Sequence, residues 1–422
     1  MISSARLDSS RPDQDTSRML DAVQRETLRY FWDYGHPVSG LARERITIGQ
    51  APDDRVAIGA SGMGVMAIVT GVERGWLRRE EAVERLLTMA RFLESAPSYH
   101  GVFPHWMNGR TGATIPFSRK DDGGDLVETA LLLQAFLCAR QYFQRYDPHE
   151  SELRRLIDRL WTETEWDWHT RGGLKMLYWH WSPNHGWSMD YEIRGWNECL
   201  VAYVLAAAAP RYGIHEGVYH GGWAQGRDFL NGRTYHGIEL PLGPDCGGPL
   251  FFSYYSFLGL DPHGLKDRYA DYWLQNVHHV LINREHCIRN PHGFKGYGPY
   301  CWGLTSDDTD EGYRNLHPML DLGFIAPHAA LASIPYCPEA SLQALRHYFG
   351  PLREHIWGEC GFVSSFSESK GWYSRDYVGL DQGATVAMIE NYRSGLFWKL
   401  FMSCPEIRSG LVKLGFESPH LT

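Results

Sequence analysis

The sequence lacks the features that mark membrane proteins and nucleic acid binding proteins. No apolar stretch reaches the roughly 18 residues that a membrane-spanning helix needs, so the chain is not expected to enter a bilayer. Lysine and arginine form no cluster, and the net charge of -9 would repel a polyphosphate backbone. We therefore expect neither a membrane nor a nucleic acid among the partners of this protein.

The short motifs of several enzyme classes are also missing. There is no HExxH, and the eight cysteines include no C-x-x-C pair, which argues against a zinc site. The glycine-rich segments DDGGD and DCGGP lack the Lys-Ser/Thr of a phosphate-binding loop, and no G-x-S-x-G elbow occurs. The sequence thus predicts no metal, no organic cofactor and no serine nucleophile, and it predicts that the cysteines are buried free thiols.

The N-terminal segment has arginines but no apolar region of the kind that a secretion signal contains. As written, the sequence predicts a soluble, cytoplasmic protein, and a leader upstream of it would make the protein periplasmic. Residues 1–16 are polar and are predicted to form a disordered arm. Since no change of composition marks a linker after this arm, residues 17–422 are predicted to form one domain.

Apolar residues recur at intervals of three and four along most of the chain, which predicts helices. The predicted helices are 19–32, 61–76, 79–93, 124–143, 151–160, 195–208, 249–258, 265–281, 327–332, 338–349 and 384–402. Long loops rich in Trp, Tyr, Gly, Asn and Asp separate many of them. Paired helices, scarce strands and long loops predict an all-α fold, an (α/α) toroid with a cleft at one end. An irregular helical domain or an α-solenoid is the alternative.

Two acidic residues, Asp125 and Glu128, stand at the start of a predicted helix, directly after the segment DDGG. They are three residues apart, so their side chains leave the helix on one face. Acidic residues in a first turn also cap a helix and complement its dipole, and this structural role stays open. The paired glycines and the aromatic loop upstream favour a functional site.

Aromatic residues are abundant and often lie among polar loop residues: the chain has 16 Trp, 23 Tyr and 18 Phe. The faces of pyranose rings stack on aromatic rings, and sugar hydroxyls bind amides and carboxylates. We expect substrate binding from His105, Trp106, Asn108, Trp179, His180, Trp181, Trp187, Asp190, Asn197, Trp372 and Asp381. Glu198, which opens an apolar helix, is a third catalytic candidate, although both Glu198 and Asp381 could be simple helix-start acids.

Carboxylates, aromatic rings and amides together are typical of a glycoside hydrolase, in which one carboxylic acid protonates the leaving oxygen and a carboxylate activates water. Asp125 or Glu128 acting with Glu198 would meet this need. A sugar epimerase on the same toroid is one alternative, with His105, His180 and His185 as its acid and base. A non-catalytic glucan-binding protein is the other.

At these residues the chain resembles the endo-β-1,2-glucanase family of glycoside hydrolases, whose catalytic region is known as a glycoamylase-like domain. The matching segments include FWDYGHPVSGLARER, VFPHWMNGRTGATIPFSRKDDGGDLVETALLLQ, LYWHWSPNHGW, IRGWNECLVAYVLAA, GGPLFFSYYSFLGLDP, GYGPYCWGLTSDD and LDQGATVAMIENYRSGLFWKLFM. They cover nearly everything after residue 20.

The resemblance implies an (α/α)6 toroid that hydrolyses β-1,2-glucan with inversion, either within the chain or from its end with release of sophorose. It implies catalytic roles for Asp125, Glu128 and Glu198. Tyr254 and Trp302 stand in two of the matching segments and are also expected to bind substrate. We expect the protein to act as a monomer on an oligo- or polysaccharide. One departure is Ile46, where the family pattern has Ser after the RER motif.

Overall fold

The computed structural model describes residues 13–421. The first helix, α1 (Gln14–Trp32), begins where the Asp13 side chain accepts a hydrogen bond from the backbone N–H of Thr16. The disordered arm predicted for residues 1–16 is therefore too long by the residues from 14 to 16, because an aspartate cap starts the helix early. Residues 1–12 lie outside the described part of the chain.

Five apolar helices and one irregular segment form an inner ring. The ring consists of α2 (Ile58–Glu73), α4 (Leu126–Tyr142), α6 (Leu200–Ala208), the 3-10 turns η4 (Leu250–Ser253) and η5 (Ser256–Leu258), α9 (Pro327–Ala332) and α12 (Gly379–Ser394). These helices are buried around most of their circumference, as expected for helices that are apolar on nearly all faces. Helix α4 packs between α2 and α6, and α12 packs against α2, α9 and η5, so the ring closes.

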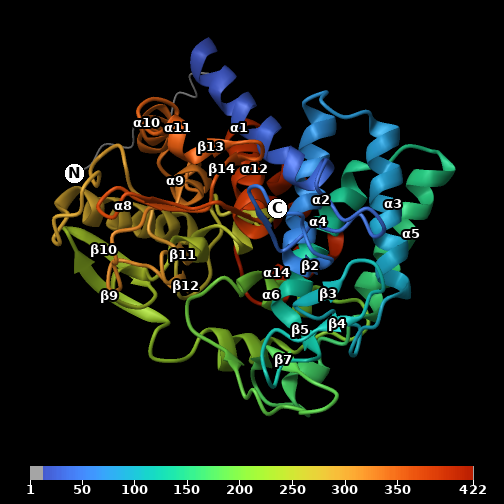
Figure 1. Cartoon of the computed structure of the whole chain (residues 1–422). Coiled ribbons are helices and arrows are strands. Elements are labelled where there is room, and N and C mark those ends of the chain that lie inside the picture. The colour runs from blue at the N-terminus through green and yellow to red at the C-terminus, as the bar shows by residue number, and fades with distance from the viewer. Residues whose placement is uncertain (1–12, 422) are drawn as a thin grey trace.

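A second layer of helices covers the ring from outside. It contains α1, α3 (Arg79–Ser95), α5 (Pro148–Glu163), α8 (Tyr272–Arg289), α10 (Pro338–Phe349) and α14 (Pro405–Lys413). These helices bury one stripe and expose charged residues on the other face. Figure 1 shows α1, in blue, beside α12, in red, so the first helix meets the last one of the inner ring. The predicted all-α toroid is confirmed.

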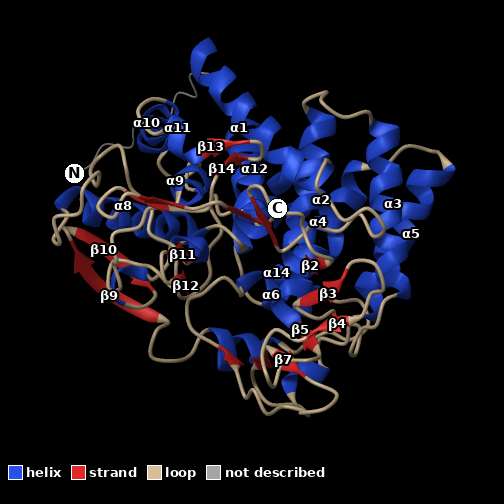
Figure 2. Ribbon diagram, in the orientation of Figure 1, coloured by secondary structure: helices blue, strands red, loops and turns tan. Residues whose placement is uncertain are grey.

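The strands are short and antiparallel and connect loops between helices, as Figure 2 shows in red. Their pairs are β1 (Arg45–Thr47) with β17 (Asp376–Val378), β5 (Gly124–Asp125) with β7 (His180–Trp181), β6 (Leu177–Tyr178) with β8 (Glu192–Ile193), β11 (Asp307–Thr309) with β12 (Gly312–Arg314), β13 (Trp357–Gly358) with β14 (Gly361–Phe362), and β15 (Phe366–Ser367) with β16 (Trp372–Tyr373). A three-stranded sheet joins β2 (Arg55–Ala57), β3 (Trp106–Asn108) and β4 (Thr114–Ile115). The longest pair is the hairpin of β9 (Leu230–Tyr235) and β10 (Ile238–Leu242).

Several short elements complete the described chain. They are η1 (Trp168–Thr170), α7 (Glu216–Val218), η2 (Tyr219–Trp223), η3 (Asp245–Gly247), α11 (Arg353–Ile356), α13 (Leu396–Met402) and η6 (Pro419–Leu421). Buried apolar side chains form a continuous cluster that extends from Leu20 in α1 to Phe416 after α14. Among residues 13–421, no helix has the length and apolar character that crossing a membrane requires.

Three predicted helices differ most from the observed ones, whereas others differ only in their bounds, such as α6, which begins at Leu200 and not at residue 195. Residues 249–258 form two 3-10 turns, and the helix predicted at 265–281 is instead α8, at Tyr272–Arg289. The helix predicted at 384–402 is interrupted at Gly395, whose φ of 66° lies in the left-handed region and ends α12 before α13 begins.

Candidate active site

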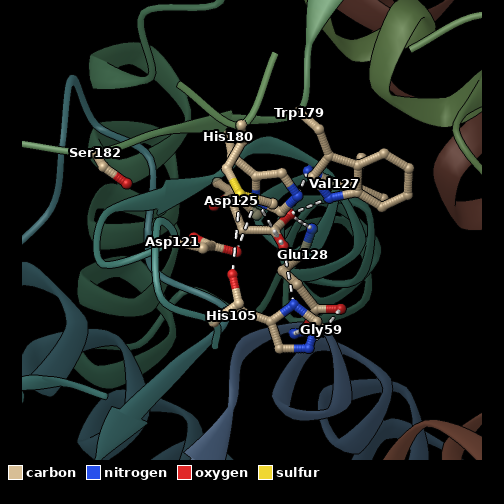
Figure 3. A network of polar contacts seen from close by, with 12 residues as sticks. Gly59, His105, Asp121, Asp125, Val127, Glu128, Trp179, His180 and Ser182 are labelled. Carbon is tan, nitrogen blue, oxygen red and sulfur yellow. Dashed lines mark hydrogen bonds and ion pairs between the residues drawn. The ribbon is translucent and has the colours of Figure 1, made fainter. Parts of the chain in front are cut away.

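Two strand pairs bring separate loops to the N-terminus of α4. Asp125 ends β5, and its partner in β7 is His180, so the loop that follows β7 lies beside the start of the helix. His105 directly precedes β3, which pairs with β2 ahead of α2. Short strands therefore place His105, Asp125 and His180 at one end of the helical ring, where Figure 3 shows these side chains together.

Asp125 is fully buried and uses both carboxylate oxygens in hydrogen bonds. Its Oδ1 accepts from the backbone N–H groups of Val127 and Glu128, each at 3.0 Å, and from the Trp179 indole at 2.9 Å. Its Oδ2 lies 2.9 Å from Nδ1 of His105. Burial opposes ionisation of Asp125, but the hydrogen bond with His105 and the charges of His180 and His105 hold its pKa below the usual value.

Glu128 extends from the first turn of α4 toward α2. Its Oε2 accepts a 2.6 Å hydrogen bond from the backbone N–H of Gly59, and its Oε1 lies 4.0 Å from Nε2 of His105. A Cβ at position 59 would lie only 2.7 Å from Oε2, so glycine is needed for this close approach. Burial and the neighbouring charge of Asp125 raise the pKa of Glu128.

His105 lies between the two carboxylates. Burial alone would lower the pKa of His105, but the charge of Glu128 and the hydrogen bond with Asp125 raise it to about 9. The imidazole is therefore a cation at neutral pH. It compensates part of the charge that Asp125 and Glu128 bring into the protein.

His180 stands on the other side of Asp125. Its Nδ1 is 3.0 Å from Oδ2 of Asp121 and 3.8 Å from Oδ2 of Asp125. The 3.0 Å contact lacks hydrogen-bond geometry, so both of its atoms are buried without a hydrogen-bond partner among the described residues. The ring stacks on Trp179 with centroids 5.8 Å apart, which keeps it beside the carboxylates.

Glu198 lies two residues before α6 and is partly exposed. The Ser256 hydroxyl donates a hydrogen bond to the backbone carbonyl of Glu198, which ties this turn to η5. Burial among protein atoms, with smaller contributions from the charges of Asp125 and Glu128, raises the pKa of Glu198 to about 7. A carboxyl group with this pKa is largely protonated in mildly acidic solution and suits the donation of a proton near neutrality.

A cavity of about 330 Å³ adjoins His105. It is lined by Glu44, Arg45, Ala57, Ala60, His105, Trp106, Phe117, Tyr313, Val378 and Leu380. Phe117 is 45% exposed, and its ring lies 4.0 Å from that of His105 and 4.8 Å from that of Trp106. Exposed aromatic faces beside a charged imidazole are suited to the apolar faces and hydroxyls of a sugar.

Two of the predicted amides hold turns together. Asn108 accepts hydrogen bonds from the backbone N–H groups of Arg110 and Thr111, each at 3.0 Å. Asn197 accepts from the backbone N–H of Cys199 at 2.9 Å, directly before α6. Both side chains therefore shape the loops that carry His105 and Glu198.

The predicted aromatic residues separate into two groups. Trp179 and Trp106 belong to the network and cavity described above, whereas Trp181 packs edge-on against His100 and Trp168. Trp187 contacts Trp168, His169 and Tyr178, and the nearby Asp190 is exposed and forms an ion pair with Arg171 at 2.5 Å. These last residues belong to a surface layer.

The late candidates occupy different surroundings. The Trp302 and Tyr254 side chains are fully buried in the apolar core. Neither side chain presents a surface to a sugar. Trp372 packs edge-on against Phe324. Asp381 lies in the first turn of α12, where its Oδ1 is 3.1 Å from Nε2 of His328.

Several residues around the site are not among those that the sequence predicts. Glu44 and Arg45, which belong to the RER motif of the family resemblance, line the cavity, and Phe117 and Tyr313 line it as well. Gly59 contacts Glu128, as described above. Among these residues, only Phe117 and Tyr313 could have been predicted from the sequence, because each is an aromatic residue within a polar loop.

The chain is similar to proteins of known family. Residues 190–405 match the family model described as "Glycoamylase: Putative glucoamylase". A solved structure from Bacteroides uniformis, described as a putative glucoamylase, has a TM-score of 0.95 and 52% identity. The match covers 96% of this chain and 99% of that one. The endo-beta-1,2-glucanase from Chitinophaga pinensis, solved with sophorotriose and glucose, has a TM-score of 0.94 and 50% identity, with 96% and 99% covered.

A curated relative from Parabacteroides distasonis, an exo beta-1,2-glucooligosaccharide sophorohydrolase acting at the non-reducing end, is 44% identical over 418 residues. The alignment covers 94% of this chain but spans 58% of the length of that relative. The family match extends over half of the sequence and includes Glu198, η4, η5, α8, α9 and α12. The chain belongs to the glycoamylase family.

Proposed function

We propose that the protein is a glycoside hydrolase that cleaves β-1,2-linked glucan by carboxylate acid/base catalysis. The observation that carries this proposal is the pKa of Glu198, about 7, in a partly exposed side chain influenced electrostatically by Asp125 and Glu128. The names of the relatives from Parabacteroides distasonis and Chitinophaga pinensis support β-1,2-glucan as the substrate.

Glu198 is the proton donor in this proposal. Cleavage of a glycosidic bond needs an acid that transfers a proton to the leaving oxygen as the bond breaks. Glu198 is more exposed than Asp125 or Glu128, and it stands where a loop meets a rigid inner helix. It therefore combines access to a substrate with a raised pKa.

Glu128 is the carboxylate that positions the attacking water. Its Oε1 accepts no hydrogen bond from residues 13–421, whereas Asp125 has both oxygens engaged in capping α4 and holding His105 and Trp179. Burial raises the pKa of Glu128, and the positive charge on His105, 4.0 Å away, opposes this rise and so favours the ionised form that a base requires. Asp125 is then a positioning residue that fixes His105.

The reaction is proposed to invert the anomeric configuration. In an inverting mechanism a water molecule fits between the sugar and the base, and the carboxylate does not form a covalent bond. Proton NMR of the first product anomer tests this directly, because inversion of a β-linkage yields the α-anomer first.

The charge state of His105 argues against this residue as the base of the epimerase alternative. With a pKa of about 9, His105 is protonated at neutral pH and has no lone pair to accept a proton from a sugar carbon. It serves instead as the cation that balances Asp125 and Glu128. A glucan-binding protein without activity would not need an acid with the pKa of Glu198.

The principal test incubates the purified protein with linear β-1,2-glucan and, separately, with β-1,3- and α-1,4-glucans, and measures reducing ends and product sizes. We expect release from β-1,2-glucan alone. A ladder of products indicates cleavage within the chain, and sophorose alone indicates cleavage from the end. If none of the three polymers is cleaved, the proposal is contradicted. If a glucan with another linkage is cleaved, the protein is still a hydrolase, but its substrate is not β-1,2-glucan.

Two variants assign the roles. Glu198→Gln and Glu128→Gln should each lower kcat by roughly 10²- to 10⁴-fold on glucan. On a nitrophenyl sophoroside, Glu198→Gln should retain much more activity, because nitrophenolate leaves without a proton. Glu128→Gln should lose activity on both substrates. If Glu128→Gln and not Glu198→Gln retained activity on the nitrophenyl sophoroside, Glu128 would be the proton donor and Glu198 the base.

A further inference from the structure

A second group of buried polar side chains lies apart from the Asp125 network, at the start of α12. It combines Asp307 from β11, His328 from α9 and Asp381 from α12. Their exposed fractions are 0%, 5% and 4%. Three elements that are distant in the sequence thus direct two carboxylates and one imidazole to the same place in the interior.

Four polar atoms of this group are buried without a hydrogen-bond partner among the described residues. They are Oδ2 of Asp307, Oδ2 of Asp381 and both ring nitrogens of His328. Nε2 of His328 is 3.1 Å from Oδ1 of Asp381, and Nδ1 is 3.6 Å from Oδ2 of Asp307, but neither contact has hydrogen-bond geometry. Leaving so many buried polar atoms unpaired is costly, and native proteins satisfy such atoms with protein groups, bound water or an ion.

The nearest guanidinium has other partners. Arg45 contacts Asp308 at 2.5 Å and Asp376 at 2.9 Å. Within residues 13–421, no ion pair joins a lysine or an arginine to Asp307 or Asp381. These two buried carboxyl groups are therefore influenced by the charge of Arg45 without a direct ion pair to it.

We propose that Asp307, His328 and Asp381 bind a divalent transition-metal cation, with Zn²⁺ as the best match. One ligand atom from each residue lies within 4.8 Å of the others. With metal–ligand distances of about 2.1 Å, neighbouring ligands of a tetrahedral ion lie roughly 3.4 Å apart, and Nε2 of His328 and Oδ1 of Asp381 approach this spacing at 3.1 Å. Asp307 contacts the other ring nitrogen, Nδ1, so its carboxylate must turn toward Nε2 when the ion binds. One imidazole with two carboxylates is a donor set that Zn²⁺ accepts, and a fourth position would remain open.

The surroundings orient the ligands. Oδ1 of Asp307 accepts a 2.7 Å hydrogen bond from the backbone N–H of Asp308, which leaves Oδ2 free to bind. Such outer contacts fix the orientation of metal ligands. The bound cation would crosslink β11, α9 and α12 beside the cavity. No short sequence motif connects these ligands, which is why the sequence alone predicted no metal.

The test measures metal binding directly and does not depend on the hydrolase proposal. Protein treated with a chelator is dialysed against Zn²⁺, and the bound metal is quantified for the native sequence, Asp307→Asn and His328→Gln. Cys301, His347 and Glu368 also place ligand atoms within 4.8 Å of one another, so His347→Gln is the matched control. Circular dichroism confirms that each variant is folded.

We expect one Zn²⁺ per chain in the native protein and in His347→Gln, with affinity lowered at least roughly 100-fold in Asp307→Asn and His328→Gln. Retention of Zn²⁺ by these two variants, or no stoichiometric binding to the native protein, overturns the proposal. A titration of the native protein with Co²⁺ needs no variant. A thiolate-to-cobalt absorption band would assign the metal to Cys301 and also overturn it.

A sugar is the competing occupant. If sophorose stabilises the native protein thermally, Zn²⁺ does not, and Asp307→Asn abolishes the stabilisation by sophorose, the group belongs to the sugar site and the metal proposal is overturned. Stabilisation by Zn²⁺ that Asp307→Asn removes supports it, whatever the result of the glucan assay.

Discussion

Protonation of Glu198 is expected to set the alkaline side of the pH–rate profile. Burial raises the pKa of this group to about 7, and only the protonated form can donate to the leaving oxygen. We therefore predict that kcat/KM on β-1,2-glucan falls about tenfold per pH unit above roughly pH 7. Initial rates of reducing-end release from pH 5 to 9 measure this.

The same profile has a built-in control. His105 keeps its proton until a pKa of about 9, so it adds no change between neutrality and that pH. A rate that stays constant over this interval would show that Glu198 is not the proton donor.

Gly59 is predicted to control the position of Glu128. In Gly59→Ala the new Cβ would lie 2.7 Å from Oε2 and 3.0 Å from Cδ of Glu128, so the carboxylate must move. We predict a loss in kcat of about 10²-fold, because a misplacement of about 1 Å is enough for that, with about 1–3 kcal/mol of destabilisation. Steady-state kinetics and urea unfolding measure the two effects.

Gly298→Ala provides the comparison, since a Cβ at that position has no atom within 4 Å. It should leave kcat unchanged. Equal losses in the two variants would mean that Gly59 has no specific relation to Glu128.

For single residues, the sequence predicted which acidic residues lie at the site better than it predicted the role of each. The sequence is compatible with Asp125 as a cap or as a catalytic group, and Asp125 does cap α4 through two backbone N–H groups while it also holds His105. The contact between Glu128 and Gly59 could not be foreseen, because it joins two helices whose relative position depends on packing across the ring.

At the scale of elements, the left-handed residue between α12 and α13 should be sensitive to substitution. Gly395 has φ 66°, and a Cβ there would meet nothing closer than Cε of Lys399 at 3.6 Å. The cost of Gly395→Ala therefore comes from the backbone and is predicted to be about 1–2 kcal/mol of unfolding free energy. Chemical denaturation measures it.

Gly395→Asn should cost less than Gly395→Ala, because asparagine tolerates the left-handed region better than alanine. Equal costs would show that side-chain packing and not the backbone angle decides the stability there.

Helix prediction succeeded where apolar spacing was long and regular and failed where other constraints dominate. Residues 249–258 are apolar enough for a helix, yet the Ser256 hydroxyl binds the Glu198 carbonyl and the Val201 N–H, and the backbone follows tight 3-10 turns. Strands of two or three residues, such as β5 and β7, are too short for an alternating pattern to appear in the sequence.

At the scale of the whole molecule, the contact between Arg74 and Glu390 joins the two ends of the ring. Arg74 at the end of α2 donates to both carboxylate oxygens of Glu390 in α12, at 2.8 and 2.7 Å, and Gln24 of α1 donates to the same carboxylate at 3.2 Å. Because Glu390 is fully buried, Arg74→Ala would leave an unpaired charge inside. We predict a loss of about 3–5 kcal/mol in unfolding free energy.

Arg78→Ala is the matched surface change. Arg78 is 74% exposed and pairs with Glu81 at 3.7 Å, so its removal should cost less than about 1 kcal/mol. Urea unfolding of both variants gives the comparison. Similar values would show that closure of the ring does not depend on the buried contact.

The overall architecture could be predicted because paired apolar helices have few stable arrangements. What the pattern did not give was the order of contacts around the ring, in which α12 returns to α2 and α1. The cavity also depends on these long-range contacts, because residues near 44, 105, 313 and 380 line it together. Long-range packing and not local sequence decides which loops face one another.

The pairing of β1 with β17 has a consequence for biosynthesis. Residues 45–47 leave the ribosome long before residues 376–378, with which they pair, so the wall that holds Arg45 beside Asp376 is completed only after residues 376–378 have emerged. Until α12 emerges, the apolar side of α2 that it covers has no partner. Until α12 has emerged, a nascent chain of this protein therefore carries an uncovered apolar surface and an unfinished cavity, and such transiently exposed apolar surface favours aggregation.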